Sequence, residues 1–249
     1  MKPVLKVWLI VLRKCAAAGV PIRIGVNSGS LEKQILAKYG APTPQALVDS
    51  ALYHARLLER FDFNNIVISI KSSNVPSMIA AYRLAAAQMD YPLHLGVTEA
   101  GTRRMGIIKS SVGIGSLLCD GIGDTIRVSL TDDPIEEVRA ARDILKAVGK
   151  GTGVEIVSCP TCGRTQIDLI ALAERVEKAL ADCNKPIKVA VMGCAVNGPG
   201  EAREADIGIA GGNGEALLFK KGVPYGKYPE EQILDVLLEE IGRMESEGV

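Results

Sequence analysis

The sequence is short of several residue types that mark common classes of protein. Aromatic residues make up 4% of its 249 residues, and 29 basic residues balance 29 acidic ones. A neutral chain lacks the broad basic field that nucleic acid or an anionic membrane surface would require, so we expect neither partner and only local recognition of anions. Its 6 cysteines are too few and too unevenly spaced for a disulfide scaffold, which indicates a reducing compartment, the cytoplasm.

Long uncharged apolar runs are also missing. The most apolar N-terminal stretch, VLKVWLIVLRKCAAAG, is interrupted by Lys6, Arg13 and Lys14. Its uncharged part is too short for a membrane span or an export signal, so we expect a buried helix instead. With 47% hydrophobic residues the chain can still build a substantial core, in one large domain or two modest ones.

What the chain does have, from Pro21 to about Lys150, is a strand, a polar loop and a helix in repeated order. The predicted strands are PIRIGV, NIVISIK, PLHLGVT and DTIRVSL. This alternation is typical of a parallel sheet covered by helices. Thr43 before Pro44 and Asp133 before Pro134 have the chemistry of helix N-caps.

The pattern changes after the sequence GKGTG. Strand VEIVSC, a helix from about Gln166 to Asp182, strand KVAVMGC, a glycine-rich segment and a final helix near 229–245 follow. We therefore place a domain boundary at about residue 150, between a domain of residues 1–150 and a domain of residues 151–249.

Each strand of the first region carries one apolar and one polar face, because side chains alternate along a strand. In a (β/α)₈ barrel the polar faces would point into the lumen, where ligands bind near the carboxyl ends of the strands. Cationic groups there need an anion to offset desolvation, and phosphate or diphosphate is the natural candidate; internal pairing with Glu99 or Asp124 is the alternative. The polar faces include Arg23, Asn27, Lys71, His94, Arg127 and Ser129.

Three cysteines follow strands of the second region. SCPTCGR supplies Cys159 and Cys162, and MGCAVNGPGE supplies Cys194. Both loops can open on the same edge of a sheet, and three thiolates at one point indicate soft-metal chemistry.

The fourth ligand of such a site distinguishes the candidates. Structural zinc normally takes four Cys or His ligands, yet both histidines belong to the first region. An iron–sulfur cluster held by three cysteines can take an oxygen ligand on its fourth iron. Glu201 is the nearby carboxylate, and Cys183, at the end of the predicted helix, is its rival. Cys15 and Cys119 lie in apolar segments and are expected to be core thiols.

With these residues in view, the chain resembles the 4-hydroxy-3-methylbut-2-enyl diphosphate synthases, iron–sulfur enzymes of the methylerythritol phosphate route to isoprenoids. The resemblance implies a TIM-barrel domain that binds a cyclic diphosphate, joined to a smaller α/β (α+β) domain that carries a [4Fe-4S] cluster. The matching segments are PIRIGVNSGSLE, PLHLGVTEAG, GIGDTIRVSLTDDP, SCPTCGR and GCAVNGPGEA.

The resemblance also implies roles for individual residues. The cluster would be held by Cys159, Cys162, Cys194 and Glu201, with Glu201 as a carboxylate that a substrate oxygen can displace. Glu99 would be the acid–base residue. Substrate contacts would come from Arg23, Asn27, Lys71, Arg127 and Ser129, to which we add His94 from the same polar face.

The reaction implied is the reductive ring opening and dehydroxylation of 2-C-methyl-D-erythritol 2,4-cyclodiphosphate to 4-hydroxy-3-methylbut-2-enyl diphosphate. Reduced ferredoxin or flavodoxin would donate the electrons. The resemblance further implies a homodimer in which the barrel of one chain faces the cluster domain of the other.

Only four predicted strand–helix units precede the cysteine-bearing region, whereas an eight-unit barrel occupies about 250 residues. The resemblance places these units as the C-terminal half of a TIM barrel, which would leave two open strand edges. Three functions stay open: the enzyme, a catalytically incompetent fragment that acts at most as a cluster-binding or electron-carrier module, and a zinc-stabilised structural or interaction protein.

Overall fold

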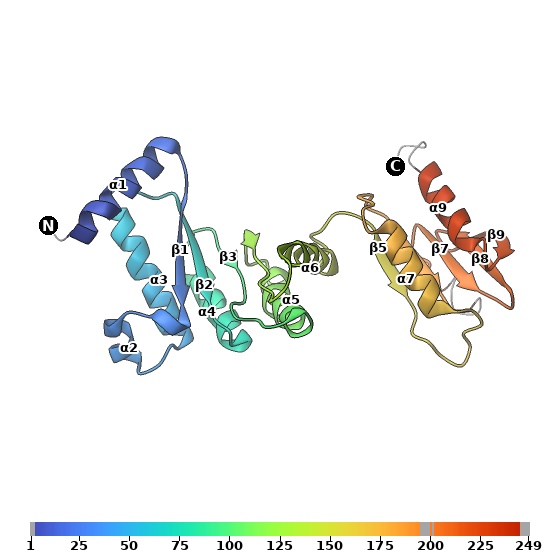
Figure 1. The fold of residues 1–249 in the computed structure, drawn as a ribbon, viewed down its shortest axis with the longest axis horizontal. Helices are drawn as coiled ribbons and strands as arrows, with labels where there is room; N and C mark the ends of the chain where they lie inside the picture. The colour runs from blue at the N-terminus through green and yellow to red at the C-terminus, as the bar shows by residue number, and fades with distance from the viewer. Residues whose placement is uncertain (1–2, 195–199, 201, 245–249) are drawn as a thin grey trace. The chain divides into compact units, whose positions relative to one another are not determined.

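The computed structural model describes residues 3–194, 200 and 202–244. The chain divides into two compact units, which we call unit 1 (Met1–Gly151) and unit 2 (Thr152–Val249). Both are labelled by element in Figure 1. In the described part of the chain, every helix is too short or too polar to span a membrane.

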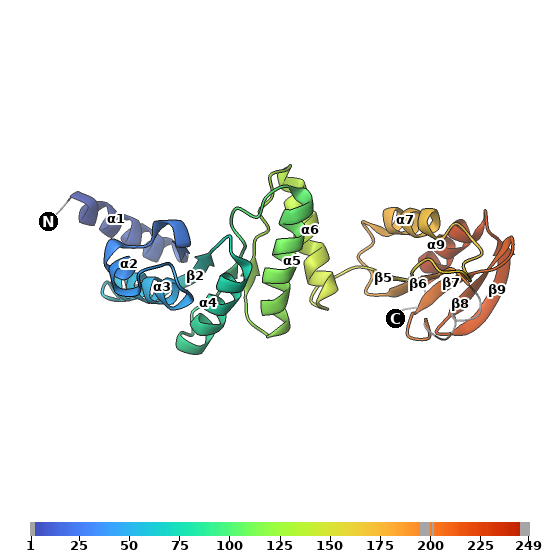
Figure 2. The same cartoon turned by 90° about the horizontal axis from the view of Figure 1, so that it is seen from below.

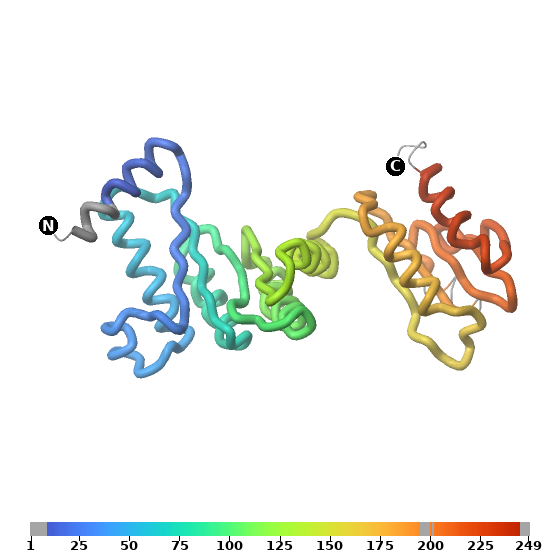
Figure 3. Tube along the Cα trace, in the orientation of Figure 1, coloured from blue at the N-terminus to red at the C-terminus, as the bar shows by residue number. Residues whose placement is uncertain are grey.

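Unit 1 alternates strands and helices (Figure 3). Strand β1 pairs in parallel with β2, β3 pairs in parallel with β4, and a single parallel bridge, Ile68 to Leu93, links β2 to β3. This arrangement is part of a (β/α) barrel, and the described residues form no closed barrel. The elements are α1 (Pro3–Ala18), β1 (Ile22–Asn27), a 3₁₀ turn η1 (Ser28–Ser30), α2 (Lys33–Tyr39), α3 (Pro44–Glu59), β2 (Ile66–Lys71), α4 (Val75–Gln88), β3 (His94–Leu95), α5 (Arg103–Cys119), β4 (Thr125–Ile126) and α6 (Pro134–Ala147).

Two helices of unit 1, α3 and α6, begin where the sequence predicts their caps. Thr43 Oγ1 accepts a hydrogen bond from Ala46 N at 3.2 Å at the start of α3, and Asp133 Oδ1 accepts one from Ile135 N at 2.8 Å at the start of α6. In both helices proline occupies the first turn, where its missing N–H costs nothing. The predicted N-caps of α3 and α6 are therefore confirmed.

The strands of unit 1 separate an apolar face from a polar one. Ile24, Ile68 and Leu95 are buried in the core beneath the helices. Arg23 and Arg127 lie on the opposite face and are exposed. Strand alternation thus directs the cationic side chains away from the core, as the sequence predicts.

Some predictions for unit 1 are wrong. The expected core thiol Cys119 is exposed at the end of α5. The N-terminal helix forms, but it is not fully buried, since Ile10 is 56% exposed while Leu12 packs in the core. The alternative of internal pairing is not seen at Asp124, which accepts a hydrogen bond from Leu93 N at 2.7 Å and forms no ion pair among the described residues.

Unit 2 is one five-stranded sheet in the order β5-β6-β7-β8-β9. The first three strands are parallel, and β8 and β9 continue the sheet antiparallel. The glycine-rich segment, for which sequence predicted no strand, supplies β7 and β8. The elements are β5 (Glu155–Ser158), α7 (Leu169–Leu180), β6 (Lys188–Met192), β7 (Ile207–Gly211), β8 (Glu215–Lys220), β9 (Val223–Pro229) and α9 (Ile233–Arg243).

Both faces of the central strands of unit 2 are buried. Helices α7 and α9 lie on one side of the sheet (Figure 2), over a core that includes Val176, Val191 and Leu237. A second, smaller core on the other face contains Ala190 and Phe219. This packing fixes the sheet edge from which the cysteine loops emerge.

Candidate functional site

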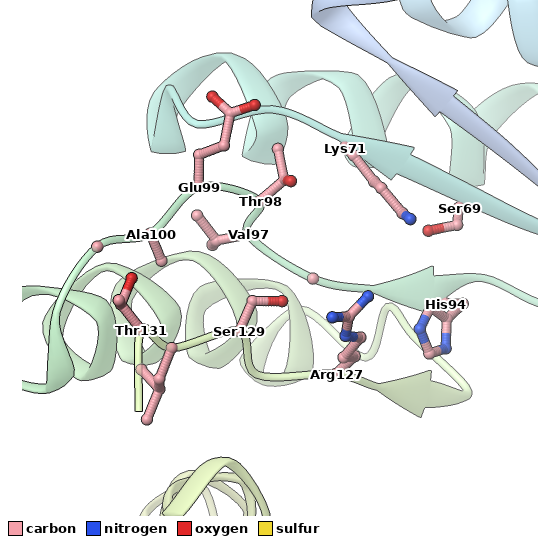
Figure 4. Close-up of a pocket in the computed structure, with 13 residues that line it drawn as sticks. Ser69, Lys71, His94, Val97, Thr98, Glu99, Ala100, Arg127, Ser129 and Thr131 are labelled. Carbon is pink, nitrogen blue, oxygen red and sulfur yellow. The ribbon is translucent and has the colours of Figure 1, made fainter. Parts of the chain in front are cut away.

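The first part of the candidate site is a cavity of about 260 Å³ in unit 1, at the carboxyl end of β2 and in the segments that follow β3 and β4 (Figure 4). It lies on the polar face of the strands, where barrel enzymes place their ligands. The side chains that line it include Ser69, Lys71, His94, Thr98, Glu99, Arg127, Ser129 and Thr131.

Two cations and a histidine gather toward one end of this pocket. Figure 4 shows Lys71, the last residue of β2, together with Arg127 and His94. Partial burial, followed by the charges of Arg23, Lys71 and Arg127, lowers the pKa of His94 below its ordinary value of 6.5. His94 is therefore mostly neutral at pH 7, and the local field favours an anion. Among the described residues, no carboxylate forms an ion pair with Lys71 or Arg127.

Glu99 lies toward the other end of the pocket, away from Lys71 and Arg127 (Figure 4). Its φ of 51° is in the left-handed region, which costs a residue with a side chain about 1 kcal/mol or more. Gly101, two residues after Glu99, also has a positive φ of 105°, so the loop after β3 turns sharply. Glu99 is exposed and lines the pocket.

Strand β1 carries the two remaining expected substrate residues, and neither lines the pocket. Asn27 pairs in register with Lys71, but its Oδ1 accepts a hydrogen bond from Gly29 N at 2.9 Å and so shapes the loop after β1. Arg23 is close enough to contribute to the low pKa of His94. The structure thus brings together Lys71, His94, Glu99, Arg127 and Ser129, with Arg23 and Asn27 on the neighbouring strand.

The sequence analysis did not select Ser69, Thr98 and Thr131, which also line the pocket. Alternation had placed Ser69 and Thr98 on the polar face, so their signal was present, but no charge distinguished them. Thr131 lies beyond β4, in a segment held by the bridge to Thr102 and by the hydrogen bond from Leu130 N to Glu137 Oε1 at 2.8 Å.

A polar network fixes the loop that follows β1. Glu32, just before α2, accepts a hydrogen bond from Ser50 Oγ at 2.8 Å and contacts His54 Nε2, both on α3. Asp49, also on α3, accepts hydrogen bonds from Lys38 at 2.8 Å and Tyr39 at 2.5 Å. These contacts hold α2 against α3, which anchors the chain directly after Asn27.

The second part of the candidate site is one edge of the sheet in unit 2. Strands β5 and β6 are parallel neighbours, with Ser158 opposite Val191. Cys159 follows β5 directly, and Cys194 lies two residues beyond the end of β6. Gly193 N donates a hydrogen bond to Cys159 Sγ at 3.2 Å, so the two cysteine loops are in contact as predicted.

Gly193 allows this contact. A Cβ at this position would lie 3.0 Å from Thr165 Oγ1 and 3.1 Å from Leu169 Cδ2. Its carbonyl accepts a hydrogen bond from Gln166 N at 3.1 Å, which ties the loop after β5 to the end of β6 a second time. Sequence reasoning missed this glycine, although it stands directly before Cys194.

Cys162 is exposed and polarised by its neighbours. Hydrogen bonds from the backbone and side chain of Arg164, with a smaller contribution from Thr165, lower the pKa of its thiol. The thiolate is the form that binds metal ions, so this environment suits a ligand.

The rival cysteine lies elsewhere. Helix α7 returns from the cysteine edge to the opposite edge, and Cys183 lies after its end, before β6 begins. The length of β6, roughly 15 Å at 3.3 Å per residue, therefore separates Cys183 from Cys194. The expected carboxylate ligand, Glu201, lies outside the described residues.

The donor set fits an iron–sulfur group. Within the described residues, no three His, Cys, Asp or Glu side chains already converge as a metal site. Cys159, Cys162 and Cys194 nevertheless share one edge, and their thiolates are the soft ligands that iron–sulfur clusters take.

Comparisons with known proteins agree with both units. A family profile described as "GcpE TIM-barrel domain" matches residues 6–142, and one described as "GcpE protein C-terminal domain" matches residues 155–243. The predicted fold class, part of a TIM barrel followed by a smaller α/β domain, is thereby confirmed.

Curated relatives give the same result. Proteins from Clostridium perfringens, Clostridium acetobutylicum and Geobacter sulfurreducens, each named 4-hydroxy-3-methylbut-2-en-1-yl diphosphate synthase (flavodoxin), are 62%, 63% and 59% identical to this chain. The matches cover 92%, 94% and 92% of the chain but 66%, 68% and 65% of the relatives, so the chain spans about two thirds of their length. On the strength of both profiles and these identities, this chain belongs to the GcpE family of 4-hydroxy-3-methylbut-2-en-1-yl diphosphate synthases.

Proposed function

We propose that this chain acts in the reductive ring opening and dehydroxylation of 2-C-methyl-D-erythritol 2,4-cyclodiphosphate to 4-hydroxy-3-methylbut-2-enyl diphosphate. One observation carries the proposal. A chain of this family combines a cationic pocket at the strand ends of its barrel unit with three cysteines at one sheet edge of its second unit.

The pocket residues bind and orient the diphosphate in this proposal. Lys71 Nζ and the Arg127 guanidinium neutralise phosphate oxygens, and Arg127 can bind two of them at once. Ser129 Oγ donates a further hydrogen bond. His94 Nδ1 lies 2.7 Å from Thr125 Oγ1, which fixes the imidazole plane beside the diphosphate. Arg23 and Asn27 complete the site from β1.

The reaction consumes two electrons. The ring C–O bond to the diphosphate breaks, the hydroxyl on the adjacent carbon leaves as water with one added proton, and a double bond forms between the two carbons. Glu99 is the residue we assign to relay that proton from water, because it is exposed and is the carboxylic acid among the residues that line the pocket. The cations at the other end stabilise the negative charge that the released diphosphate oxygen gains.

Cys159, Cys162 and Cys194 would hold a [4Fe-4S] cluster, with Glu201 as the fourth ligand. When bound, the cluster supplies the electrons one at a time. As a hard oxygen ligand, the Glu201 carboxylate would be more readily displaced than the three thiolates. Glu201 is thus proposed in two roles, as a ligand and as a catalytic group.

The electron donor we propose is a flavodoxin, since the relatives carry that word in their names. We also propose a homodimer and a cytoplasmic location, the latter because thiols must stay reduced to bind the cluster. Sedimentation of the loaded protein tests the dimer: a monomer at every concentration, together with full activity, would exclude it.

A second candidate is a cluster-binding or electron-carrier module without turnover of its own. The exposure of Arg23 and Arg127 favours it, because water weakens the attraction between these cations and a diphosphate. A pure carrier, however, gains nothing from the cationic pocket.

The proposal is tested by turnover of the cyclic diphosphate with a chemical reductant, after anaerobic reconstitution of the full chain. Lys71→Ala should lose activity, whereas Arg142→Ala, which removes an exposed cation on α6, should not. Cluster uptake without turnover would contradict the enzyme proposal and support the electron-carrier module. One bound zinc and no acid-labile sulfide would contradict both proposals and support a zinc-stabilised structural protein.

A further inference from the structure

The ladder between β2 and β3 is interrupted at one rung. Ile68 N donates to Pro92 O at 2.8 Å, so in a regular parallel ladder Ile70 N would donate to the carbonyl of His94. Instead both groups bind the hydroxyl of Tyr82. Ile70 N donates to Tyr82 Oη at 2.9 Å, and Tyr82 Oη donates to His94 O at 2.5 Å.

Tyr82 reaches this rung from the outer layer. It lies on α4, and its side chain is 0% exposed. Burial raises the pKa of Tyr82 to about 12, against the smaller opposing effects of Ile70, Ser69 and Arg23. The phenol therefore keeps its proton at neutral pH and can satisfy both backbone groups at once.

The inserted hydroxyl widens the gap between the strands. A direct N–H···O bond spans about 2.9 Å, whereas here two hydrogen bonds lie in series. This accounts for the division of the strands into a β1-β2 pair and a β3-β4 pair. The rung lies beside the pocket, because Lys71 follows Ile70 on β2 and His94 itself supplies the carbonyl.

We propose that Tyr82 is a positioning residue: its hydroxyl sets the separation of β2 from β3, and with it the distance from Lys71 to His94 and Arg127 across the pocket. The ligand of that pocket, a diphosphate, rests on the proposed function, whereas the spacing does not. Without the hydroxyl, the strands close to a direct rung and Lys71 moves toward His94, so the cations no longer match the phosphate oxygens.

If the hydrogen bonds of Tyr82 only stabilised the fold, its substitution would have different effects. It would lower the melting temperature and leave the affinity of the folded protein unchanged. Two controls separate these cases. Tyr91→Phe removes a tyrosine hydroxyl that contacts Glu59 at an exposed position of the same unit. Ile144→Val trims a core side chain of α6 and costs about 1 kcal/mol of stability, and it changes no residue of β2 or β3.

The test is the affinity of the full-length chain for inorganic pyrophosphate, measured by calorimetry well below the melting temperature. Tyr82→Phe should weaken binding about tenfold, as expected when charge-assisted contacts are misplaced. Tyr91→Phe and Ile144→Val should bind like the original protein. Equal affinity of Tyr82→Phe and the original protein would overturn the proposal.

The histidine NMR signals give a readout that does not depend on the ligand. The chain has 2 histidines, so His94 can be followed with His54 as the reference. In Tyr82→Phe, the approach of Lys71 should lower the pKa of His94 further. The signal of His54 should be the same in Tyr82→Phe as in the original protein. If the original protein fails to bind pyrophosphate, the proposed function fails. The His94 titration then tests the role of Tyr82 by itself, and an unchanged pKa of His94 in Tyr82→Phe would overturn that role.

Should Tyr82→Phe not fold, 3-fluorotyrosine placed at position 82 keeps the hydroxyl and the fold. Its ¹⁹F signal should shift when pyrophosphate is added, whereas the same label at position 91 should be silent. A silent label at position 82, with pyrophosphate bound, would contradict the proposal.

Discussion

The parallel strands of the two units differ in how many of their faces are buried. In unit 1 the strands bury one face and leave the other open, so that Arg23 and Arg127 are exposed on the polar face. In unit 2 every residue of β7 is buried, and the cysteine loops emerge where β5 and β6 end. A surface that must hold an anion stays polar and accessible, whereas a scaffold for thiols can be apolar throughout.

This difference determines where substitutions should matter. In unit 1 the sensitive residues are charged and lie on the open face, and their loss should affect ligand binding more than folding. In unit 2 the sensitive residues are the cysteines at the edge and the small residues packed beneath them.

The largest effect is expected at the sheet edge of unit 2. Replacing Cys159, Cys162 or Cys194 by serine should abolish cluster binding, because each removes a thiolate from a site that has only three. Cys183→Ser is the matched control and should keep the cluster, since Cys183 lies at the opposite edge. Visible absorption after anaerobic reconstitution measures both. A colourless Cys183→Ser protein would overturn the ligand set.

On the open face of unit 1, Lys71→Ala should weaken pyrophosphate binding by about ten- to a hundredfold, as expected for loss of one charge-assisted contact. The melting temperature should change little, because Lys71 forms no ion pair with the described residues. Calorimetry measures the affinity, with Arg142→Ala as the control. Loss of folding together with binding would show that this face is structural.

The small residues of unit 2 should affect stability alone. A Cβ on Gly208 would lie 2.4 Å from Phe219 Cζ and 2.8 Å from Ala190 Cβ. Gly208→Ala should therefore reduce the free energy of unfolding by about 1–3 kcal/mol.

Gly242 provides the matched control, because it lies near the end of α9 and a Cβ there meets no atom within 4 Å. Gly242→Ala should stabilise unit 2 by up to about 1 kcal/mol through helix propensity. Urea unfolding compares the two variants. If both changed stability by the same amount, packing beneath the sheet edge would not be as tight as described.

The smallest effect concerns protons in the pocket. The folded state lowers the pKa of His94, so the unfolded chain binds this proton more tightly, and the free energy of unfolding falls as the pH drops below 6.5. Arg23→Gln removes one of the responsible charges and should raise the pKa of His94, which lessens that loss. NMR titration of the imidazole measures it. An unchanged titration would place Arg23 too far away to act on the pocket.

Much of unit 1 could be predicted because its signals are local. Thr43–Pro44 and Asp133–Pro134 define helix starts by their own chemistry, and alternation alone places Lys71 and Arg127 on the polar face. The wider rung between β2 and β3 could not be predicted. It depends on Tyr82, which lies 12 residues from both Ile70 and His94, and no local pattern marks that contact.

Unit 2 was less predictable for a related reason. The cysteine motifs stand out in the sequence, and the contact of Gly193 with Cys159 follows from two adjacent parallel strands. Strand β7, however, contains Gly208 and Gly211, and Gly212 follows it before β8 begins. Glycine is depleted in strands, so local propensity predicts turns here. Strands β7 and β8 form because Phe219 fills the space above Gly208, a tertiary effect that overrides local preference.

The most direct test of the account asks whether the two units have separate duties. Pyrophosphate affinity and cluster absorption are measured on the same two full-length variants, Lys71→Ala and Cys194→Ser. We expect Lys71→Ala to weaken pyrophosphate binding by about ten- to a hundredfold and keep the cluster. We expect Cys194→Ser to lose the cluster and keep pyrophosphate binding within about twofold, a difference of less than 0.5 kcal/mol. Loss of both properties in either variant would contradict the division of substrate binding and cluster binding between unit 1 and unit 2.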